Sequence, residues 1–137
     1  MSEYERSRTV AAPPEDVFAQ AGDVDQIETW LPRELHVRRE EPPAVTVHDD
    51  DTGRDAPALL RARRDELRLE WGTRDDGRYE GWLQVEGISD GASAVTVHLS
   101  FFDEGLAPPD NEVTVALDES LDRLAEQVRL RADRQGR

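Results

Sequence analysis

The sequence predicts an α+β fold in which a seven-stranded antiparallel sheet is covered on one face by a long C-terminal helix. Six segments between residues 35 and 102 place apolar residues at every second position and are joined by short turns, which is typical of antiparallel strands. Residues 113–128 place apolar residues at every third or fourth position, which is typical of an amphipathic helix. One more strand and two short helices are expected before residue 35.

The first strand is expected over residues 4–10, where the alternation of side chains has a period of two. The pattern leaves open which side of this strand faces the core. Arg6 and Arg8 favour water, and that preference would turn Ser7 and Thr9 inward. The first strand is therefore predicted without an assigned face.

Two short helices are expected to follow it. Pro13 and Pro14 suit a first helical turn, because the N–H that proline lacks would be unpaired there. Gly22 can end this helix in the left-handed conformation. Asp23 then begins a second helix, with Gln26 three residues later as in a capping box. The residues expected to face the core are Val17, Phe18 and Ala21 in the first helix and Val24, Ile27 and Leu31 in the second.

The later strands are expected at about 35–40, 44–48, 58–63, 66–72, 79–86 and 93–102. The turn signals between them are Pro42-Pro43, Asp51-Thr52-Gly53, Arg64-Asp65, Asp75-Asp76-Gly77 and Asp90-Gly91. Aspartate–glycine pairs favour hairpins, because both residues tolerate positive φ. Along the last three strands an apolar face opposes a polar one, so one side of the sheet needs a cover.

The C-terminal helix is predicted to be that cover. Its apolar stripe consists of Val113, Leu117, Leu121, Leu124 and Val128. The start of the helix is left open by the β-branched residues near 113–115. Asp110 or Asn111 could cap a long helix, or Asp118 could begin a shorter one.

Composition limits the class of protein. At 137 residues the chain is expected to form a single domain, 1–137. The formal net charge of −14 disfavours nucleic acid and anionic lipid surfaces as partners and favours a monomer or weak dimer. The chain has no Cys and no apolar run long enough to enter a membrane, so we expect a cytoplasmic, acidic protein.

The order of elements resembles the START-like superfamily, also called SRPBCC, and within it the bacterial polyketide cyclase/dehydrase-type group. The local pattern that carries the resemblance is Val10, Ala12-Pro13, Glu15, Val17-Phe18, Asp23 and Trp30-Leu31-Pro32. The resemblance implies a helix-grip fold, in which the sheet curls around the C-terminal helix over a cavity. It also implies ligands such as lipids, sterols, polyketides, quinones or plant hormones. Some members are cyclases, some are carriers and some activate a chaperone.

The implied cavity lies between the sheet and the C-terminal helix. The residues expected to line it are Trp30, Leu69, Trp71, Tyr79, Leu83, Val97, Leu99, Phe101, Leu117, Leu121 and Leu124. An unfilled apolar void of about 300 Å³ would cost on the order of 7 kcal/mol, so a ligand or water fills it or the cavity has collapsed. Trp30 can be a lid or a core plug, and Tyr79 is the best candidate for a hydroxyl that points into the cavity.

Histidines and acidic residues raise the question of a metal site. His36, His48 and His98 lie on different predicted strands without metal-ligand spacing and share faces with polar residues. We therefore expect solvent-facing histidines and no metal or other cofactor. The Asp49-Asp50-Asp51 run could hold Ca²⁺ or Mg²⁺, but a solvated acidic loop is the favoured interpretation.

Three functions stay open at this point. The first is non-catalytic binding of a small hydrophobic molecule, with no catalytic residue assigned. The second is a polyketide cyclase or dehydratase that folds its substrate in the cavity, with Tyr79 or an inward Arg polarising a carbonyl. Arg61 and Arg63 could face inward in this way, or could pair on the outer face with a Glu of a neighbouring strand. The third is an interaction or regulatory domain whose cavity has closed.

Overall fold

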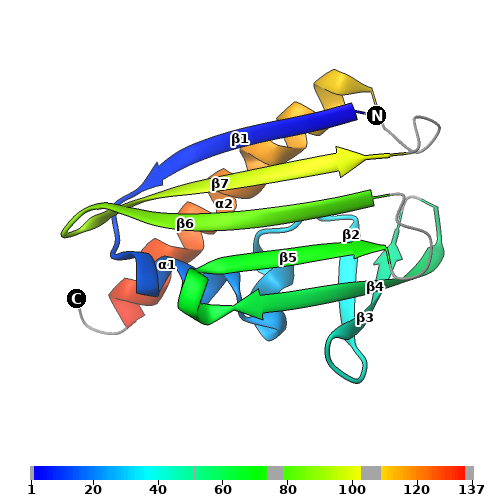
Figure 1. Ribbon diagram of the computed structural model, residues 1–137, viewed down its shortest axis with the longest axis horizontal. Coiled ribbons are helices and arrows are strands. Elements are labelled where there is room, and N and C mark those ends of the chain that lie inside the picture. The colour runs from blue at the N-terminus through cyan, green and yellow to red at the C-terminus, as the bar shows by residue number, and fades with distance from the viewer. Residues whose placement is uncertain (1, 51, 74–78, 103–108, 135–137) are drawn as a thin grey trace.

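The computed structural model describes residues 2–50, 52–73, 79–102 and 109–134 (Figure 1). The elements are β1 (Ser2–Val10), α1 (Pro14–Ala21), the 3₁₀ helix η1 (Val24–Thr29), β2 (Leu35–Arg39), β3 (Ala44–Asp49), β4 (Arg54–Arg63), the 3₁₀ helix η2 (Arg64–Glu66), β5 (Arg68–Thr73), β6 (Tyr79–Ser89), β7 (Ala92–Phe101) and α2 (Asp110–Arg134). The strands form one sheet in the order β1-β7-β6-β5-β4-β3-β2, and all neighbours are antiparallel.

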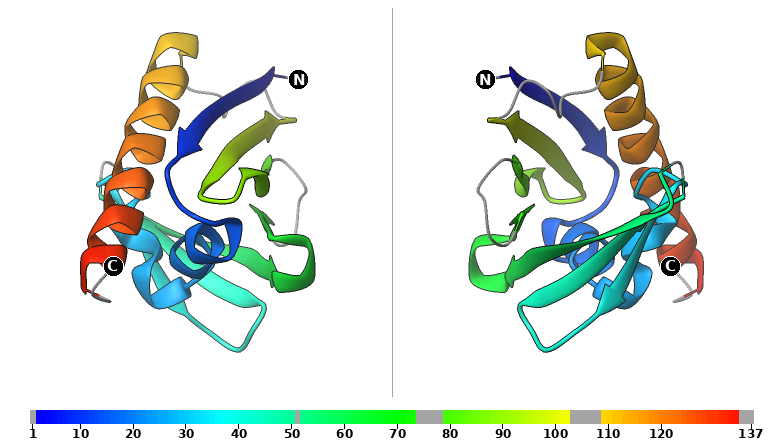
Figure 2. Two further views of the ribbon diagram at one scale, coloured as in Figure 1. Left: turned by 90° about the vertical axis from the view of Figure 1, so that its left-hand side faces the viewer. Right: turned by 90° about the vertical axis from the view of Figure 1, so that its right-hand side faces the viewer.

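The sheet is curved, and all of the longer helical elements lie on its concave side. Figure 2 shows α1 between the strands and α2, and α2 running along the β1 edge. This is the helix-grip arrangement, and it confirms the predicted α+β fold with a seven-stranded antiparallel sheet, two short helices after the first strand and a long C-terminal helix.

The pairing of β1 with β7 assigns the face of the first strand. Arg6 lies opposite Val97 and Arg8 opposite Val95, so both arginines are on the helix side, and the face that the sequence left open is assigned against their preference for water. The reason is that β1 is an edge strand, so its side chains reach past the core to the acidic flank of α2. Arg8 pairs with Asp122 there.

Several helix boundaries differ in detail from the prediction. Gly22 follows α1 with φ −88°, so it does not use the left-handed conformation expected of it. The second helix is a 3₁₀ helix, and the Asp23 side chain accepts the backbone N–H of Asp25 at 3.0 Å. The long alternative for the C-terminal helix is correct, since α2 begins at Asp110.

The strand predictions need smaller corrections. β4 begins at Arg54 rather than near residue 58, and β6 continues to Ser89 through an irregularity after Gly87. The expected Arg64-Asp65 turn is the η2 helix, and the residue that follows it, Leu67, has φ 54°. The predicted Asp75-Asp76-Gly77 turn lies outside the described residues.

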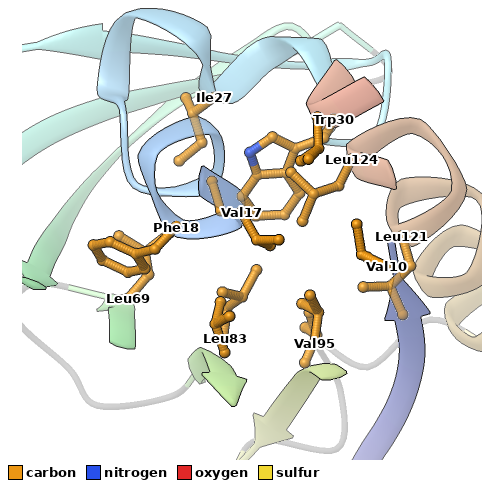
Figure 3. Packing of buried hydrophobic residues seen from close by; sticks show 14 of the residues in the cluster. Val10, Val17, Phe18, Ile27, Trp30, Leu69, Leu83, Val95, Leu121 and Leu124 are labelled. Atoms are coloured by element: carbon orange, nitrogen blue, oxygen red, sulfur yellow. The ribbon is translucent and has the colours of Figure 1, made fainter. Parts of the chain in front are cut away.

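The core lies between α1, α2 and the concave face of the sheet (Figure 3). All five predicted stripe residues of α2 are buried in it. From the sheet side Leu69, Leu83 and Val95 are fully buried, and α1 contributes Val17 and Phe18. The prediction that the C-terminal helix covers the apolar face of the sheet is therefore confirmed, and the side chains that do so are the predicted ones.

Candidate functional site

The residues predicted to line a cavity fall into two groups along the concave face. Seven of them are buried in the core: Trp30, Leu69, Leu83, Val97, Leu117, Leu121 and Leu124. The other four are only partly buried: Trp71, Tyr79, Leu99 and Phe101. The first group forms a packed floor, and the second lies toward the end of the concave face where side chains become partly exposed.

Exposure changes along β6 and β7 in the same direction. In the cross-strand pair Leu83–Val97 the two side chains are 0% and 3% exposed. In the pair Tyr79–Phe101, which lies four residues away on each strand, both side chains are partly exposed. Trp30 is 2% exposed and lies with the floor (Figure 3), so it packs as a core plug rather than as a lid.

The partly exposed end carries a row of aromatic side chains from four neighbouring strands, which we call the aromatic row: Trp71, Tyr79, Phe101 and Tyr4. The Trp71 indole Nε1–H donates to the Tyr79 hydroxyl oxygen at 3.0 Å. The ring centres of Tyr79 and Phe101 are 4.8 Å apart, and those of Tyr4 and Phe101 are 6.0 Å apart in an edge-to-face contact. The Tyr4 hydroxyl donates to Asp110 at 2.5 Å, so the row ends at the first turn of α2.

Gly81 makes room for the tryptophan of this row. Trp71 and Gly81 are direct cross-strand partners, and Gly81 is buried. A Cβ at Gly81 would lie 2.4 Å from Trp71 Nε1. The indole can therefore approach the β6 backbone this closely because residue 81 has no side chain.

The Tyr79 phenol is held in its neutral form. Burial raises the pKa of Tyr79 to about 12, and the hydrogen bond from Trp71 offsets only part of that rise. Its oxygen accepts the indole N–H, and the neutral hydroxyl keeps one proton that it can donate.

This raised pKa predicts a loss of stability at high pH. The folded state keeps a proton that the unfolded chain releases above about pH 10, so the free energy of unfolding should fall as pH rises from about 10 to 12, by at most about 2–3 kcal/mol. The sequence has no Lys or Cys to titrate in this window. Urea unfolding at pH 9.5 to 11.5 measures the effect. The decline should vanish in Tyr79→Phe and persist in Tyr4→Phe; an equal decline in Tyr79→Phe would contradict the assignment.

The opposite, outer face of the sheet is polar and charged. Trp82 stacks on His98, with ring centres 5.2 Å apart, and the Arg68 guanidinium lies 4.6 Å from the Trp82 ring centre. Hydrogen bonds from Arg68 and then Arg63 lower the pKa of Glu70. A depression of about 480 Å³ lies over this region.

The outer face also settles the orientation of the two arginines of β4. Arg61 lies opposite Glu70 in the sheet register, and Arg63 Nε donates to Glu70 at 2.8 Å. Their outward direction excludes Arg61 and Arg63 as groups that polarise a carbonyl on the concave face. It confirms the outer-face interpretation of this pair.

Two residues of the aromatic end were missed by sequence reasoning. Tyr4 could have been placed once the face of β1 was known, because it alternates with Arg6 and Arg8. Gly81 alternates with the apolar residues Leu83 and Val85 and so shares their inward face, which leaves one position of that face without a side chain. Neither signal by itself points to an aromatic row.

The fold and the one-sided site define a helix-grip α+β protein. The family described as "Polyketide cyclase / dehydrase and lipid transport" matches residues 1–129. The chain belongs to this family, which confirms the START-like resemblance seen in the sequence. No curated protein matches the sequence.

Solved structures share the fold at low sequence identity. XoxI from Bacillus cereus is 18% identical with a TM-score of 0.76, over 93% of this chain and 96% of that one. The di-domain ARO/CYC protein BexL of the BE-7585A biosynthetic pathway is 19% identical with a TM-score of 0.74, over 95% of this chain and 47% of that one. The di-domain ARO/CYC protein StfQ of the steffimycin pathway is 19% identical with a TM-score of 0.73, over 96% and 47%. The chain thus spans about half of each di-domain protein.

Within the described ranges, no helix has the length and apolar character that crossing a membrane requires.

Proposed function

We propose that this protein binds a small, largely apolar molecule between the concave face of the sheet and α2, at the end marked by the aromatic row, and that it does so without catalysis. The observation that carries the proposal is the contrast along the concave face. Its floor is packed, yet four aromatic side chains gather where packing stops. Partly exposed aromatic groups offer large apolar contact area at little entropic cost, which is typical of ligand contacts.

The row also indicates the chemistry of the ligand. Phe101 and the faces of Trp71 and Tyr79 favour a flat or aliphatic apolar body. The neutral Tyr79 hydroxyl can donate one hydrogen bond to a carbonyl or hydroxyl oxygen of that body. An aromatic polyketide, a quinone or a fatty acid derivative satisfies both requirements. On the strength of the net charge of −14 we also propose a monomer or weak dimer, and from the lack of Cys in the sequence a cytoplasmic location.

Replacement of one tryptophan at a time tests the proposed face. Trp71→Leu should weaken binding of the best apolar ligand at least about tenfold, because it removes a contact worth about 1.4 kcal/mol or more. Trp82→Leu is the matched control, since Trp82 lies on the outer face of the adjacent strand. Native mass spectrometry of a panel of lipids, quinones and aromatic polyketides selects the ligand, and calorimetry measures its affinity.

Two outcomes would overturn the proposal. Equal losses in the two variants would place the ligand elsewhere. Absence of binding across all three ligand classes would favour an interaction domain whose cavity has closed.

The second candidate is an enzyme of the cyclase or dehydratase type. Its specific support is that two of the similar structures are ARO/CYC proteins, and that Tyr79 presents a protonated hydroxyl to the same space. In that case the hydroxyl would polarise a substrate carbonyl. Tyr79→Phe separates the candidates: a carrier keeps most of its affinity, whereas an enzyme binds its polyketide substrate but loses turnover.

A further inference from the structure

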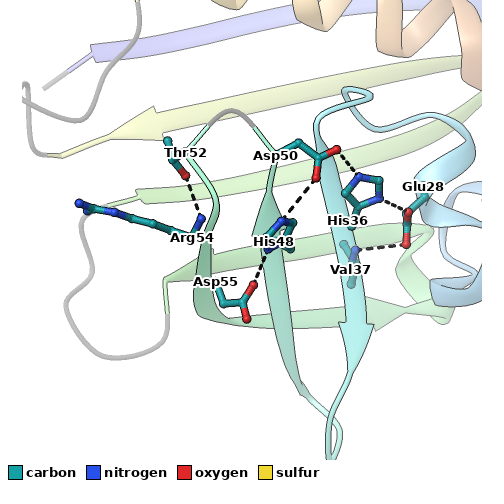
Figure 4. A network of polar contacts seen from close by, with 8 residues as sticks. All are labelled: Glu28, His36, Val37, His48, Asp50, Thr52, Arg54 and Asp55. Carbon is teal, nitrogen blue, oxygen red and sulfur yellow. Dashed lines mark hydrogen bonds and ion pairs between the residues drawn. The ribbon is translucent and has the colours of Figure 1, made fainter.

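A second cluster of chemically active side chains lies far from the aromatic row, on the outer face of the sheet at β2, β3 and β4 (Figure 4). His36, His48 and Asp55 occupy one rung, since His36 pairs with His48 across β2–β3 and His48 pairs with Asp55 across β3–β4. The two imidazole ring centres are 6.3 Å apart. The sequence places these histidines twelve residues apart, so only the hairpin register brings them together.

The ε nitrogens of both rings face one carboxylate. His36 Nε2 is 2.7 Å from Asp50 Oδ2, and His48 Nε2 is 3.4 Å from Asp50 Oδ1. The start of the Asp50 side chain is fixed, because the backbone N–H of Asp50 donates to the Glu34 carbonyl at 2.8 Å. Two nitrogens and a carboxylate thus converge from three positions.

The δ nitrogens are each held by another carboxylate. His36 Nδ1 is 2.8 Å from Glu28 Oε1, and His48 Nδ1 is 2.6 Å from Asp55 Oδ1. Glu28 is itself anchored, since its other oxygen accepts the Val37 backbone N–H at 3.3 Å. A carboxylate on the far nitrogen fixes the ring orientation of metal-binding histidines and aims Nε2 at the ion.

The hydrogen-bond donors and acceptors of this cluster favour a positive group between the two imidazoles and Asp50. An ionised carboxylate only accepts, so a neutral imidazole that donates from Nδ1 would turn a lone pair on Nε2 toward the Asp50 oxygens. The 2.7 Å contact between His36 Nε2 and Asp50 has the length of a hydrogen bond, so a metal ion would have to displace the proton between these two atoms.

We propose that His36 Nε2, His48 Nε2 and the Asp50 carboxylate bind one divalent transition-metal ion of the Zn²⁺ class, with Glu28 and Asp55 as positioning residues. Two imidazoles and one carboxylate suit Zn²⁺ or Cu²⁺, whereas Mg²⁺ and Ca²⁺ favour oxygen ligands alone. A fourth position would be left to water. This site is independent of the apolar ligand proposed for the concave face.

Binding needs a small rearrangement. As placed, no group of three or more His, Cys, Asp and Glu side chains among the described residues could hold a metal ion, and both imidazoles contact Asp50 directly. Zn–N bonds of about 2.0–2.1 Å bring two coordinated rings to roughly 5–6 Å between centres, so a rotation of Asp50 and a closure of about 1 Å suffice. All three ligand side chains are roughly half exposed, so this shift would displace no packed core residue.

The test is calorimetric titration of Zn²⁺ into the chelator-treated full chain, with Mg²⁺ as a second probe. We expect one Zn²⁺ per chain, and binding at least about tenfold weaker in His48→Gln but unchanged in His98→Gln, the matched control on the same face. Asp55→Asn should weaken binding by about 10–100-fold through the ring orientation.

Other results would overturn the proposal. These are no saturable Zn²⁺ binding, equal losses in His48→Gln and His98→Gln, or Mg²⁺ binding as tight as Zn²⁺, which would indicate an acidic cluster only. If His48→Gln fails to fold, NMR of the unaltered protein decides: Zn²⁺ should shift the ring signals of His36 and His48 together and leave those of His98 in place.

Discussion

Replacing Leu124 with alanine is expected to lower the free energy of unfolding by about 2–5 kcal/mol. Leu124 is 0% exposed on the stripe of α2 that faces the core (Figure 3). The truncated side chain would leave a void among residues contributed by the sheet, α1 and η1, and such a void can close only in part. Because small domains are stable by about 5–15 kcal/mol, this single change could remove much of the total.

The control for this substitution is Val115→Ala on the same helix. Val115 is 54% exposed, so its truncation should change stability by no more than about 0.5 kcal/mol. Urea titrations followed by far-UV circular dichroism measure both variants. Equal midpoints for the two would mean that α2 does not hold the sheet through this stripe, and the fold described above would need revision.

The sequence predicts this half of the molecule well because burial there follows simple periods. The apolar stripe of the helix at 113–128 and the alternation that puts Leu83 and Val85 on one face of β6 each indicate which side chains face inward. A one-sided sheet and a one-sided helix of matching length have few ways to bury both faces. The same reasoning gives the order from β2 to β7, because short turns favour pairing of neighbours in sequence, but it does not place β1 beside β7.

The sequence does not predict contacts that depend on the pairing register of two strands or on the position of a strand at the edge of the sheet. Arg6 and Arg8 break the rule that charge faces away from the core side, because the edge position of β1 lets them reach Asp118 and Asp122. His36 and His48 meet only through the exact pairing of β2 with β3. A period of two assigns faces but not partners, so neither the ion pairs nor the histidine cluster could be read from alternation alone.

The aromatic row depends on a further kind of information, the absence of a side chain. Trp71→Leu tests the ring itself, but Gly81→Ala tests the space that the ring occupies. Alanine in a strand interior normally stabilises by about 0.5–1 kcal/mol relative to glycine. Here a Cβ would lie 2.4 Å from the indole nitrogen, so we expect the opposite sign, a loss of about 1–3 kcal/mol, as overpacking displaces the ring.

The same displacement should weaken apolar ligand binding, because Trp71 would lose its hydrogen bond to Tyr79 and move out of the row. Gly91→Ala is the control, since a Cβ there meets no heavy atom within 4 Å. Urea unfolding and Trp fluorescence follow the two variants.

A double-mutant cycle then assigns the cause. In a Trp71→Leu background the cost of Gly81→Ala should fall by about 1 kcal/mol or more, since the obstructing ring is gone. An unchanged cost would mean that the strain arises in the backbone of β6, and the close approach of Trp71 to Gly81 would no longer explain why a glycine stands in the middle of this strand.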